Sequence, residues 1–243
     1  MGTDLSGRAA IVTGASRGIG RAIATRLAAR GAAVVVGYLR NEAKANAVVE
    51  EITGHGGRAI AVQGDLARPA EVTRLFDRAE QEFGALDVVV ANAADVVIKP
   101  VVDCTEEDFD SLFAANAKSA FFTMQEAARR LRDGGRIIAT STGGTRMFFT
   151  ETSLYLGTKA AVEQFVRVLS RELGPRGITV NALSPGFTDT DLLPERDREV
   201  AAGMSPFGRV GQPEDVADVA VFLAGEEGRW VTGQNLGAGG GVF

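Results

Sequence analysis

Short runs of β-forming apolar residues recur along the chain, and segments with helical periodicity separate them. The apolar residues of each run mostly occupy consecutive positions, which is typical of parallel strands buried on both faces. The runs cover residues 8–13, 32–38, 58–63, 86–91, 135–140, 177–183 and 233–238, and the helical segments cover 18–30, 42–54, 69–83, 106–131, 153–173 and 213–224. Repeated strand–helix units predict an α/β fold, with a doubly wound sheet of about seven parallel strands and helices on both faces.

Composition narrows the classes of partner. The 243 residues carry a net charge of −5, which disfavours nucleic acid or an anionic membrane as the main partner. With a single cysteine, Cys104, and a single histidine, we expect no internal disulfide and no metal site. No leader-like segment and no apolar stretch of membrane-spanning length stand out. We therefore expect one domain over residues 1–243, located in the cytoplasm.

The stretch TGASRGIG, residues 13–20, lies between the first predicted strand and an amphipathic helix. Glycine allows a tight turn at Gly14 and removes side chains at Gly18 and Gly20, where a phosphate and a neighbouring strand approach closely. The N-terminus of the helix offers N–H donors to a pyrophosphate. An ordinary strand–helix loop is the alternative, and the position directly after the first strand favours the phosphate site. The candidate cofactor residues in this turn are Gly14, Ser16, Arg17, Gly18, Ile19 and Gly20.

The end of the second strand lacks the acidic side chain that would hold the ribose hydroxyls of a dinucleotide. Tyr38 stands there, with Arg40 close by and Arg17 in the glycine turn. Two guanidinium groups suit a 2′-phosphate, so NADPH is favoured over NADH unless Arg40 is only a solvated charge. Asp65 and Leu66 follow the third strand, where we expect them to meet the adenine edge unless Asp65 merely caps the next helix.

Tyr155 and Lys159 stand four residues apart in a helical segment, so they share one face of that helix. A nearby ammonium favours the phenolate, and we expect it to lower the pKa of Tyr155 from about 10 toward the working pH. A tyrosine tuned in this way exchanges a proton with a carbonyl or alcohol oxygen. Taken alone, the pair is more simply interpreted as a core tyrosine beside a surface lysine.

Polar residues elsewhere in the chain extend this candidate site. Ser141 and Thr142 follow the 135–140 strand, and a hydroxyl at that edge of a parallel sheet can bind a substrate oxygen. Both residues can donate, and the choice between them stays open. Asn116 is a poor choice for a helix interior, which indicates either a task, such as holding a water near Lys159, or local hydrogen bonding.

In this order and spacing, the motifs resemble the short-chain dehydrogenase/reductase family over essentially the whole chain. The matching elements are TGASRGIG, GDL, ANAA, YLGTK, LSPGFTDT and VTGQNL. The resemblance implies a Rossmann fold and a hydride transferred, without metal, between a nicotinamide and a carbonyl or alcohol carbon. It implies that Tyr155 is the general acid/base, that Lys159 lowers its pKa and binds the nicotinamide ribose, that Ser141 orients the substrate, and that Asn116 supports a proton relay.

The resemblance also implies further cofactor contacts, at Asn92, Ala93, Ala94, Pro185, Gly186, Thr188 and Thr190. Two departures from the family pattern bear on the site. The stretch ANAA (91–94) replaces the family's NNAG. The usual family spacing of thirteen residues before the tyrosine falls on Thr142, whereas the stretch SLYLGTKAAVEQFVR is similar to fungal naphthol reductases, whose spacing favours Ser141.

Apolar side chains near these loops indicate the kind of substrate. Val96 follows the fourth strand, Met147 and Phe148 follow Ser141, and Phe187 and Leu192 lie in the irregular segment 187–210, which we expect to act as a substrate lid. They favour an apolar ketone, aromatic or polyketide-like, unless they are core or subunit-contact residues.

The sequence thus predicts an NADPH-dependent reductase of a small-molecule ketone, able to catalyse the reverse alcohol oxidation. One alternative is a 3-oxoacyl-[acyl-carrier-protein] reductase, for which the chain offers scattered arginines rather than a basic docking patch. The other is a dinucleotide-sensing protein without turnover, which the complete set of site residues disfavours. The family resemblance further implies a homotetramer or homodimer built partly from the helices over 106–131 and 153–173.

Overall fold

A computed structural model describes residues 3–243 and shows one sheet of parallel strands. The strand order is β3-β2-β1-β4-β5-β6-β7, and every neighbouring pair is parallel. The strands are β1 (Ala9–Val12), β2 (Ala33–Tyr38), β3 (Arg58–Gln63), β4 (Leu86–Ala91), β5 (Leu131–Thr140), β6 (Thr179–Pro185) and β7 (Asn235–Ala238). The predicted doubly wound α/β fold is confirmed.

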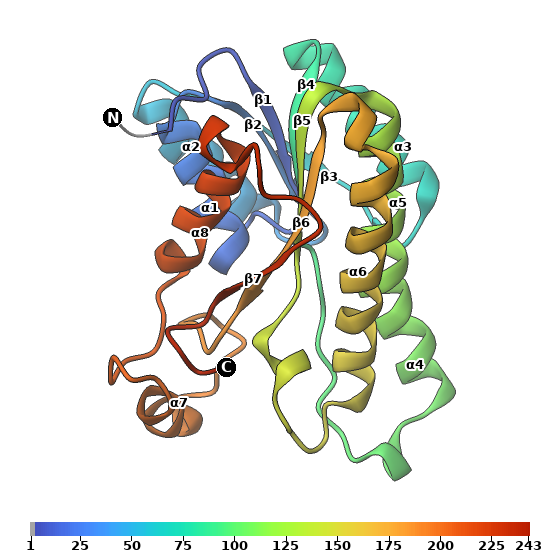
Figure 1. The fold of residues 1–243 in the computed structure, drawn as a ribbon, viewed down its shortest axis with the longest axis vertical. Helices are drawn as coiled ribbons and strands as arrows, with labels where there is room; N and C mark the ends of the chain where they lie inside the picture. The colour runs from blue at the N-terminus through green and yellow to red at the C-terminus, as the bar shows by residue number, and fades with distance from the viewer. Residues whose placement is uncertain (1–2) are drawn as a thin grey trace.

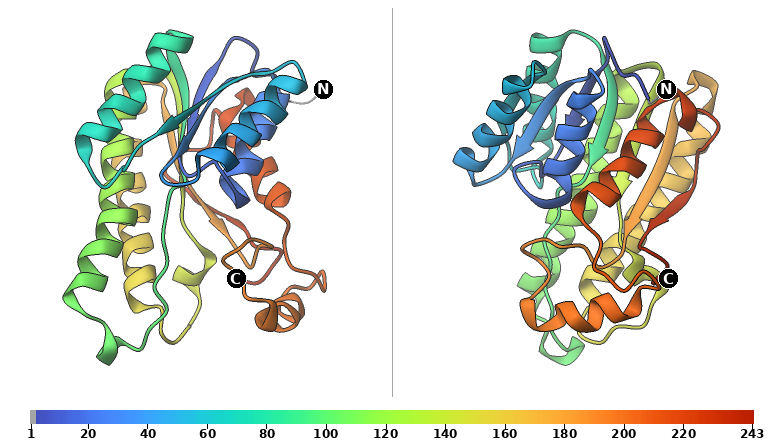
Figure 2. Two further views of the ribbon diagram at one scale, coloured as in Figure 1. Left: turned by 180° about the vertical axis from the view of Figure 1, so that it is seen from behind. Right: turned by 90° about the vertical axis from the view of Figure 1, so that its left-hand side faces the viewer.

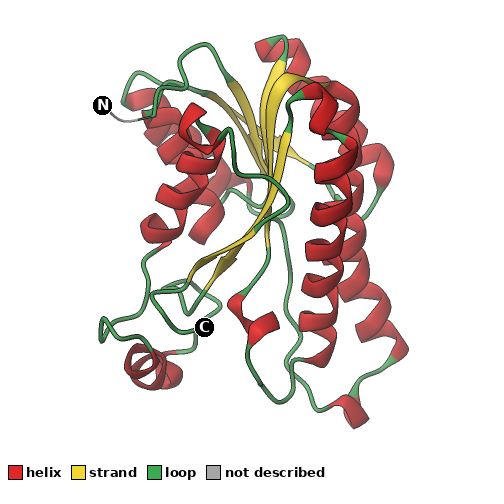
Figure 3. Cartoon of the chain, in the orientation of Figure 1, coloured by secondary structure: helices red, strands yellow, loops and turns green. Residues whose placement is uncertain are grey.

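Helices cover both faces of the sheet and make it the middle of three layers (Figure 1; Figure 3). One face packs against α1 (Gly18–Ala29), α2 (Glu42–Gly54) and α8 (Pro213–Ala224), and the other against α3 (Pro69–Phe83), α5 (Ser119–Arg130) and α6 (Ser153–Glu172). On β2, Val34 and Val36 enter the first core cluster and Val35 enters the second. Each face buries every second side chain, so consecutive strand positions are apolar. Within residues 3–243, none of the helices combines the length and apolar character that crossing a membrane requires.

The helix predicted over residues 106–131 is interrupted. α4 (Glu106–Phe113) passes into a π-helical turn at Ala114–Lys118 before α5 begins, and β5 already starts at Leu131. Single π-helical turns are found frequently at functional sites. This turn contains Asn116, whose side chain is buried, so the irregularity falls on a predicted site residue.

The carboxyl ends of the strands face the segments that were predicted to form the site. β1 and β4 are neighbours in the sheet, and the chain leaves them toward helices on opposite faces, which marks the point where open α/β sheets bind ligands. The loop 143–152 and the lid segment 187–210, which includes α7 (Arg198–Met204), both lie beyond this edge (Figure 1), and Figure 2 shows the same placement in turned views.

Candidate active site

The glycine turn after β1 is fixed by close backbone packing. Gly14 has a φ of +64°, and a Cβ there would come within 2.9 Å of the Cα of Ala93. A Cβ on Gly20 would come within 2.3 Å of the carbonyl oxygen of Gly14 and 2.6 Å of Asn92 Nδ2. Real Cβ atoms do not tolerate such distances, so any side chain at these positions would force the turn apart.

The N-terminus of α1 opens from this turn. Its first helical hydrogen bond runs from the N–H of Arg21 to the carbonyl of Arg17, so the N–H groups of residues 18–20 precede it. The N-cap residue, Arg17, makes no side-chain cap within the described part of the chain. Together with the helix dipole, these donors form an anion site. Across from it, Gly18 faces Thr190, whose Cγ2 would lie 3.3 Å from an added Cβ.

Cations gather near the same turn. Arg17 Nη1 lies 3.1 Å from a carboxylate oxygen of Asp191 in the lid segment, and Lys44 Nζ lies 3.7 Å from the same oxygen. The hydrogen bond from Arg17 and the charge of Lys44 lower the pKa of Asp191. Arg40 is exposed beyond β2, while Tyr38 is buried. Lys44 was not among the predicted cofactor residues, because its position in α2 does not indicate that its side chain lies near the lid segment.

Asp65 stabilises a turn rather than the start of a helix. Its carboxylate accepts a hydrogen bond of 3.2 Å from the N–H of Ala67 and pairs with Arg68 at 3.3 Å. The N-cap of α3 is Arg68, so the capping alternative raised for Asp65 is wrong. The predicted contact of Asp65 and Leu66 with the adenine edge stays a prediction.

Tyr155 and Lys159 lie in the first two turns of α6, beneath the end of β5. Lys159 is 3% exposed, and its Nζ donates a hydrogen bond of 2.8 Å to the carbonyl of Thr140. Nζ also lies 5.8 Å from the centroid of the Tyr155 ring. Burial lowers the pKa of Lys159 to about 8, because a desolvated ammonium is disfavoured.

Burial raises the pKa of Tyr155, and a hydrogen bond from Thr142 opposes this rise. The prediction that Lys159 lowers the pKa of Tyr155 is therefore wrong. The Lys159 ammonium lies against the tyrosine ring and donates to the Thr140 carbonyl, and desolvation of the phenol has the largest effect on the tyrosine pKa. At neutral pH the phenol keeps its proton. A protonated phenol is the form that donates to a carbonyl oxygen.

Ser141 and Thr142 point to different partners. Ser141 is 3% exposed, and its hydroxyl donates to Glu163 Oε1 at 2.6 Å. Thr142 has extended backbone, with φ −157° and ψ 146°, and its hydroxyl accepts a hydrogen bond of 3.2 Å from the N–H of Gly144. Of these two hydroxyls, the one that affects the pKa of Tyr155 is that of Thr142, and the Ser141 hydroxyl is bonded to Glu163.

Asn116, in its π-helical turn, links the loop after β4 to α6. Its Nδ2 donates to the carbonyl of Asp95 at 2.9 Å and to Thr158 Oγ1 at 3.0 Å, and its Oδ1 accepts from the N–H of Asp95 at 2.7 Å. Thr158 directly precedes Lys159 in α6. The amide therefore fixes the loop after β4 against the helix that carries Tyr155 and Lys159, through bonds that are not the local ones raised as the alternative. A role in holding water stays a prediction.

The ANAA stretch joins three strand ends. Thr13 Oγ1 accepts hydrogen bonds of 2.9 Å from the N–H groups of Asn92 and Ala93. Asn92 Nδ2 donates to the Thr13 carbonyl at 3.0 Å, and its Oδ1 accepts from Thr140 Oγ1 at 3.2 Å. β1, β4 and β5 thus share one network. Thr13 and Thr140 were not predicted, because ordinary strand-end threonines carry no sequence signal of their partners.

The segment after β6 is held close to the chain end. A Cβ on Gly186 would come within 2.7 Å of the Cα of Gly239. Thr188 is buried, donates to the carbonyl of Gly186 at 3.1 Å and forms an isolated bridge with Gly211. Pro185 ends β6 at the same edge. These predicted cofactor residues are therefore brought to the side of the sheet where the glycine turn lies.

The predicted substrate residues separate in space. Phe148 is fully exposed, so the structure places this predicted pocket residue in solvent, and Leu192 is 56% exposed. Phe149, the residue after Phe148, packs edge to face against Phe187 of the lid segment, with ring centroids 5.9 Å apart. Val96 and Met147 are half-buried. Phe149 is thus an aromatic contact between the loop 143–152 and the lid segment.

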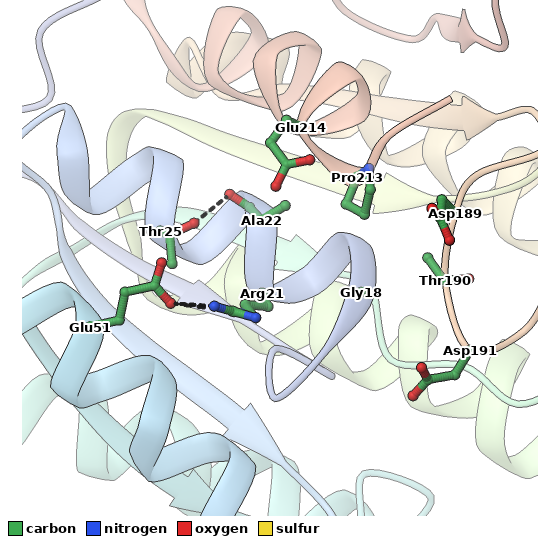
Figure 4. Close-up of a pocket in the computed structure, with 10 residues that line it drawn as sticks. All are labelled: Gly18, Arg21, Ala22, Thr25, Glu51, Asp189, Thr190, Asp191, Pro213 and Glu214. Carbon is green, nitrogen blue, oxygen red and sulfur yellow. Dashed lines mark hydrogen bonds and ion pairs between the residues drawn. The ribbon is translucent and has the colours of Figure 1, made fainter. Parts of the chain in front are cut away.

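A separate depression of about 290 Å³ lies between α1, the lid segment and α8 (Figure 4). Gly18 and Thr190 are the predicted cofactor residues that border it. Arg21 and four carboxylate residues, Glu51, Asp189, Asp191 and Glu214, are among the others that line it, and Glu51 accepts a hydrogen bond of 2.8 Å from Arg21. Tyr155 and Lys159 are not among the residues that line it. Within residues 3–243, no group of three or more His, Cys, Asp or Glu side chains is arranged to hold a metal ion.

Comparison with known proteins places this site in a family. A family model described as enoyl-(acyl carrier protein) reductase matches residues 14–243. The chain is 42% identical over 255 residues to the versicolorin reductase of Emericella nidulans, covering 98% of this chain and 97% of that protein. It is 43% identical over 249 residues to a hydroxynaphthalene reductase-like protein of Metarhizium majus, covering 95% and 93%. The crystal structure of an angucycline C-6 ketoreductase with bound NADP superposes with a TM-score of 0.94 at 42% identity, covering 100% of this chain and 98% of that one.

The fold, the glycine turn and the tyrosine–lysine helix pair define the class of NAD(P)-dependent oxidoreductases with a Rossmann domain. Within that class, the chain belongs to the short-chain dehydrogenase/reductase family. The family resemblance seen in the sequence is confirmed.

Proposed function

We propose that this protein is an NADPH-dependent ketoreductase that reduces an apolar, aromatic or polyketide-like ketone. The observation that carries the proposal is the pair of Tyr155 and buried Lys159 on α6, with Lys159 bonded to the carbonyl at the end of β5, the sheet edge from which the glycine turn also follows β1. One end of the site can thus bind phosphates while the other holds a proton ready for a carbonyl oxygen. Relatives that carry the names versicolorin reductase, hydroxynaphthalene reductase-like protein and angucycline C-6 ketoreductase support this substrate class.

The cofactor is proposed to be NADPH/NADP⁺. The N–H groups of residues 18–20 and the adjacent cations fit its phosphates, and NADPH supplies the hydride when it is bound. Tyr155 donates its proton to the carbonyl oxygen, and Thr142 donates a hydrogen bond that orients that oxygen. Lys159, fixed by the Thr140 carbonyl, holds its charge beside the phenol and in reach of a ribose. Asn116 keeps α6 and the loop after β4 in register.

A preference for NADPH over NADH follows from Arg17 and Arg40, with Lys44 as a third cation near the same edge. Replacing Arg40 with alanine removes a donor to the 2′-phosphate, so we expect NADPH affinity to fall roughly tenfold while NADH affinity changes little. Binding titrations of both cofactors measure this difference. Equal weakening of the two would show that Arg40 does not contact the 2′-phosphate.

The lid segment is proposed to close over the substrate. The edge-to-face contact between Phe149 and Phe187 joins it to the loop after β5, and the ion pair between Arg17 and Asp191 joins it to the phosphate end. Both contacts lie at exposed or half-exposed positions, where a modest change of conformation costs little. An aromatic substrate would stack on the same two rings.

The experiment that tests the function is NADPH oxidation with three groups of ketone. Bicyclic and tricyclic aromatic ketones represent the proposed class, 3-oxoacyl thioesters represent the acyl-carrier-protein alternative, and a no-ketone control detects cofactor loss. We expect turnover with the aromatic ketones. Preference for the thioesters would support the acyl reductase, and NADPH binding without turnover on any of them would support the dinucleotide sensor.

A cytoplasmic location and an assembly of two or four chains belong to the same proposal. Large apolar side chains are exposed along α4, α5 and α6, with Phe109 46%, Phe121 42% and Val168 59% exposed, and Trp230 is 94% exposed near β7. These exposed apolar side chains support a subunit contact on these helices. Light scattering after size-exclusion chromatography measures the assembly, and a monomer at micromolar concentration would contradict it.

A further inference from the structure

Glu163 contacts the loop that presents Thr142, and it lies on the same ridge of α6 as the catalytic pair. Tyr155, Lys159 and Glu163 follow one another at intervals of four residues, so they line one face of the helix. Glu163 Oε1 accepts a hydrogen bond of 2.6 Å from Ser141 Oγ and one of 2.7 Å from Thr145 Oγ1. Within residues 3–243, Glu163 forms no ion pair.

These two hydrogen bonds bracket the Thr142 position. Ser141 is the residue before Thr142, and Thr145 lies three residues after it, on the far side of Gly143 and Gly144. Two consecutive glycines give a loop wide conformational freedom, so its geometry depends on anchors on either side. Hydrogen bonds to a carboxylate are shorter and stronger than those between neutral groups.

The Thr142 hydroxyl is left with its proton to donate. Its oxygen accepts a hydrogen bond of 3.2 Å from the N–H of Gly144, which fixes the side chain as the N-cap of the following 3₁₀ turn. A hydrogen bond from Thr142 acts to lower the pKa of Tyr155, against the larger effect of burial. The direction of that donor depends on the path of the loop, and Glu163 holds the path.

We propose that Glu163 is a positioning residue of the active site, which acts through Ser141 and Thr145 to hold the Thr142 hydroxyl opposite Tyr155. The inference rests on the proposed ketoreductase function. It also gives Ser141 a role other than orienting the substrate: Ser141 is one of the two hydroxyl anchors of the loop. A displacement of about 1 Å in a group that orients substrate is enough to slow a reaction roughly a hundredfold.

Four variants test the inference. Glu163→Ala removes the acceptor of both hydrogen bonds, and Glu163→Gln keeps an acceptor oxygen. The double variant Ser141→Ala with Thr145→Val removes the two donors, and Glu172→Ala is the control at an exposed position of the same helix. We expect Glu163→Ala to lower kcat about 10-fold to 100-fold with the Kd of NADPH unchanged. Glu163→Gln restores most of the activity, because its amide oxygen accepts the same bonds. The double variant matches Glu163→Ala, and combining all three changes adds little, since they break one unit.

Parallel assays of the unmodified protein and of Tyr155→Phe separate this inference from the proposed function. Turnover by the first and its loss in the second support the ketoreductase, whatever Glu163 does. Unchanged kcat in Glu163→Ala, or a change confined to NADPH binding, would overturn the positioning role. If Glu163→Ala fails to fold, the Glu163→Gln and double variants test the positioning role instead. A double variant whose kcat equals that of the unmodified protein would contradict the inference. A double variant with a lower kcat and normal NADPH binding would support it.

Discussion

The phosphate end and the catalytic end of this site are specified in different ways. At the phosphate end, the decisive feature is missing side chains: a Cβ on Gly14 or Gly20 would collide with the backbone of the turn or of Ala93. At the catalytic end, the decisive feature is the direction of side chains that are present, such as Thr142, Lys159 and Phe149. A site built from backbone can be recognised in a sequence by its glycines, whereas a site built from side-chain direction cannot be recognised as surely.

The largest effect is expected from the catalytic end. Replacing Tyr155 with phenylalanine removes the proton donor and keeps the ring that lies beside Lys159. We expect kcat to fall by about 10²-fold to 10⁴-fold, the usual contribution of a general acid, with NADPH affinity nearly unchanged. Steady-state kinetics and a cofactor titration measure both. Turnover within a few-fold of the unmodified protein would refute the assignment.

The choice between adjacent hydroxyls sharpens the comparison. Replacing Thr142 with valine keeps its shape and removes the donor, and we expect kcat to fall roughly a hundredfold, as on losing one donor to a developing oxyanion. Ser141→Ala, which loses one loop anchor, is expected to be less severe. The ratio of the two kcat values is the measurement, and a more damaging Ser141→Ala would return the orienting role to Ser141.

Titration of Lys159 tests the burial of the catalytic pair. Its pKa falls from 10.5 to about 8 on folding, so between these values the unfolded chain binds more protons than the folded protein. Stability therefore rises with pH across that window and carries a constant penalty below it. Relative to Lys159→Met, we expect the free energy of unfolding of the unmodified protein to increase by about 2 kcal/mol between pH 7 and about pH 9.5. Parallel denaturant titrations check this, and identical pH dependence would mean that the lysine is solvated.

The phosphate end is tested by a pair of glycine substitutions. Gly20→Ala places a methyl group 2.3 Å from the Gly14 carbonyl oxygen, and we expect a loss of about 1–3 kcal/mol of stability together with weaker NADPH binding. Gly54→Ala, in α2, has open space around it and is expected to raise stability by up to about 1 kcal/mol. Thermal unfolding of both variants measures the difference. Equal stability would show that the turn adapts to a side chain.

The sequence predicted the sheet well, because strands buried on both faces must be apolar at consecutive positions. It also predicted the glycine turn, since only residues without a Cβ fit there. The interrupted helix at Ala114–Lys118 could not be predicted, because a π-helical turn changes the register by one residue without a distinctive composition.

Two site details shared one physical cause. Thr142 faces Tyr155 while Ser141 faces Glu163, and Phe149 meets the lid while Phe148 faces solvent. In extended chain, successive side chains point to opposite sides, so an uncertainty of one residue in loop length exchanges the inner and outer residue. Spacing from Tyr155 alone could not settle whether Ser141 or Thr142 faces the site.

The most direct measurement is a crystal structure of the protein with NADP⁺ and an unreactive aromatic ketone bound. The predicted result places the pyrophosphate on the N–H groups of residues 18–20, and the ketone oxygen within hydrogen-bond distance of both the Tyr155 phenol and the Thr142 hydroxyl. A ketone oxygen bound elsewhere, with the Tyr155 hydroxyl turned away from the nicotinamide, would contradict the assignment of Tyr155 as the proton donor.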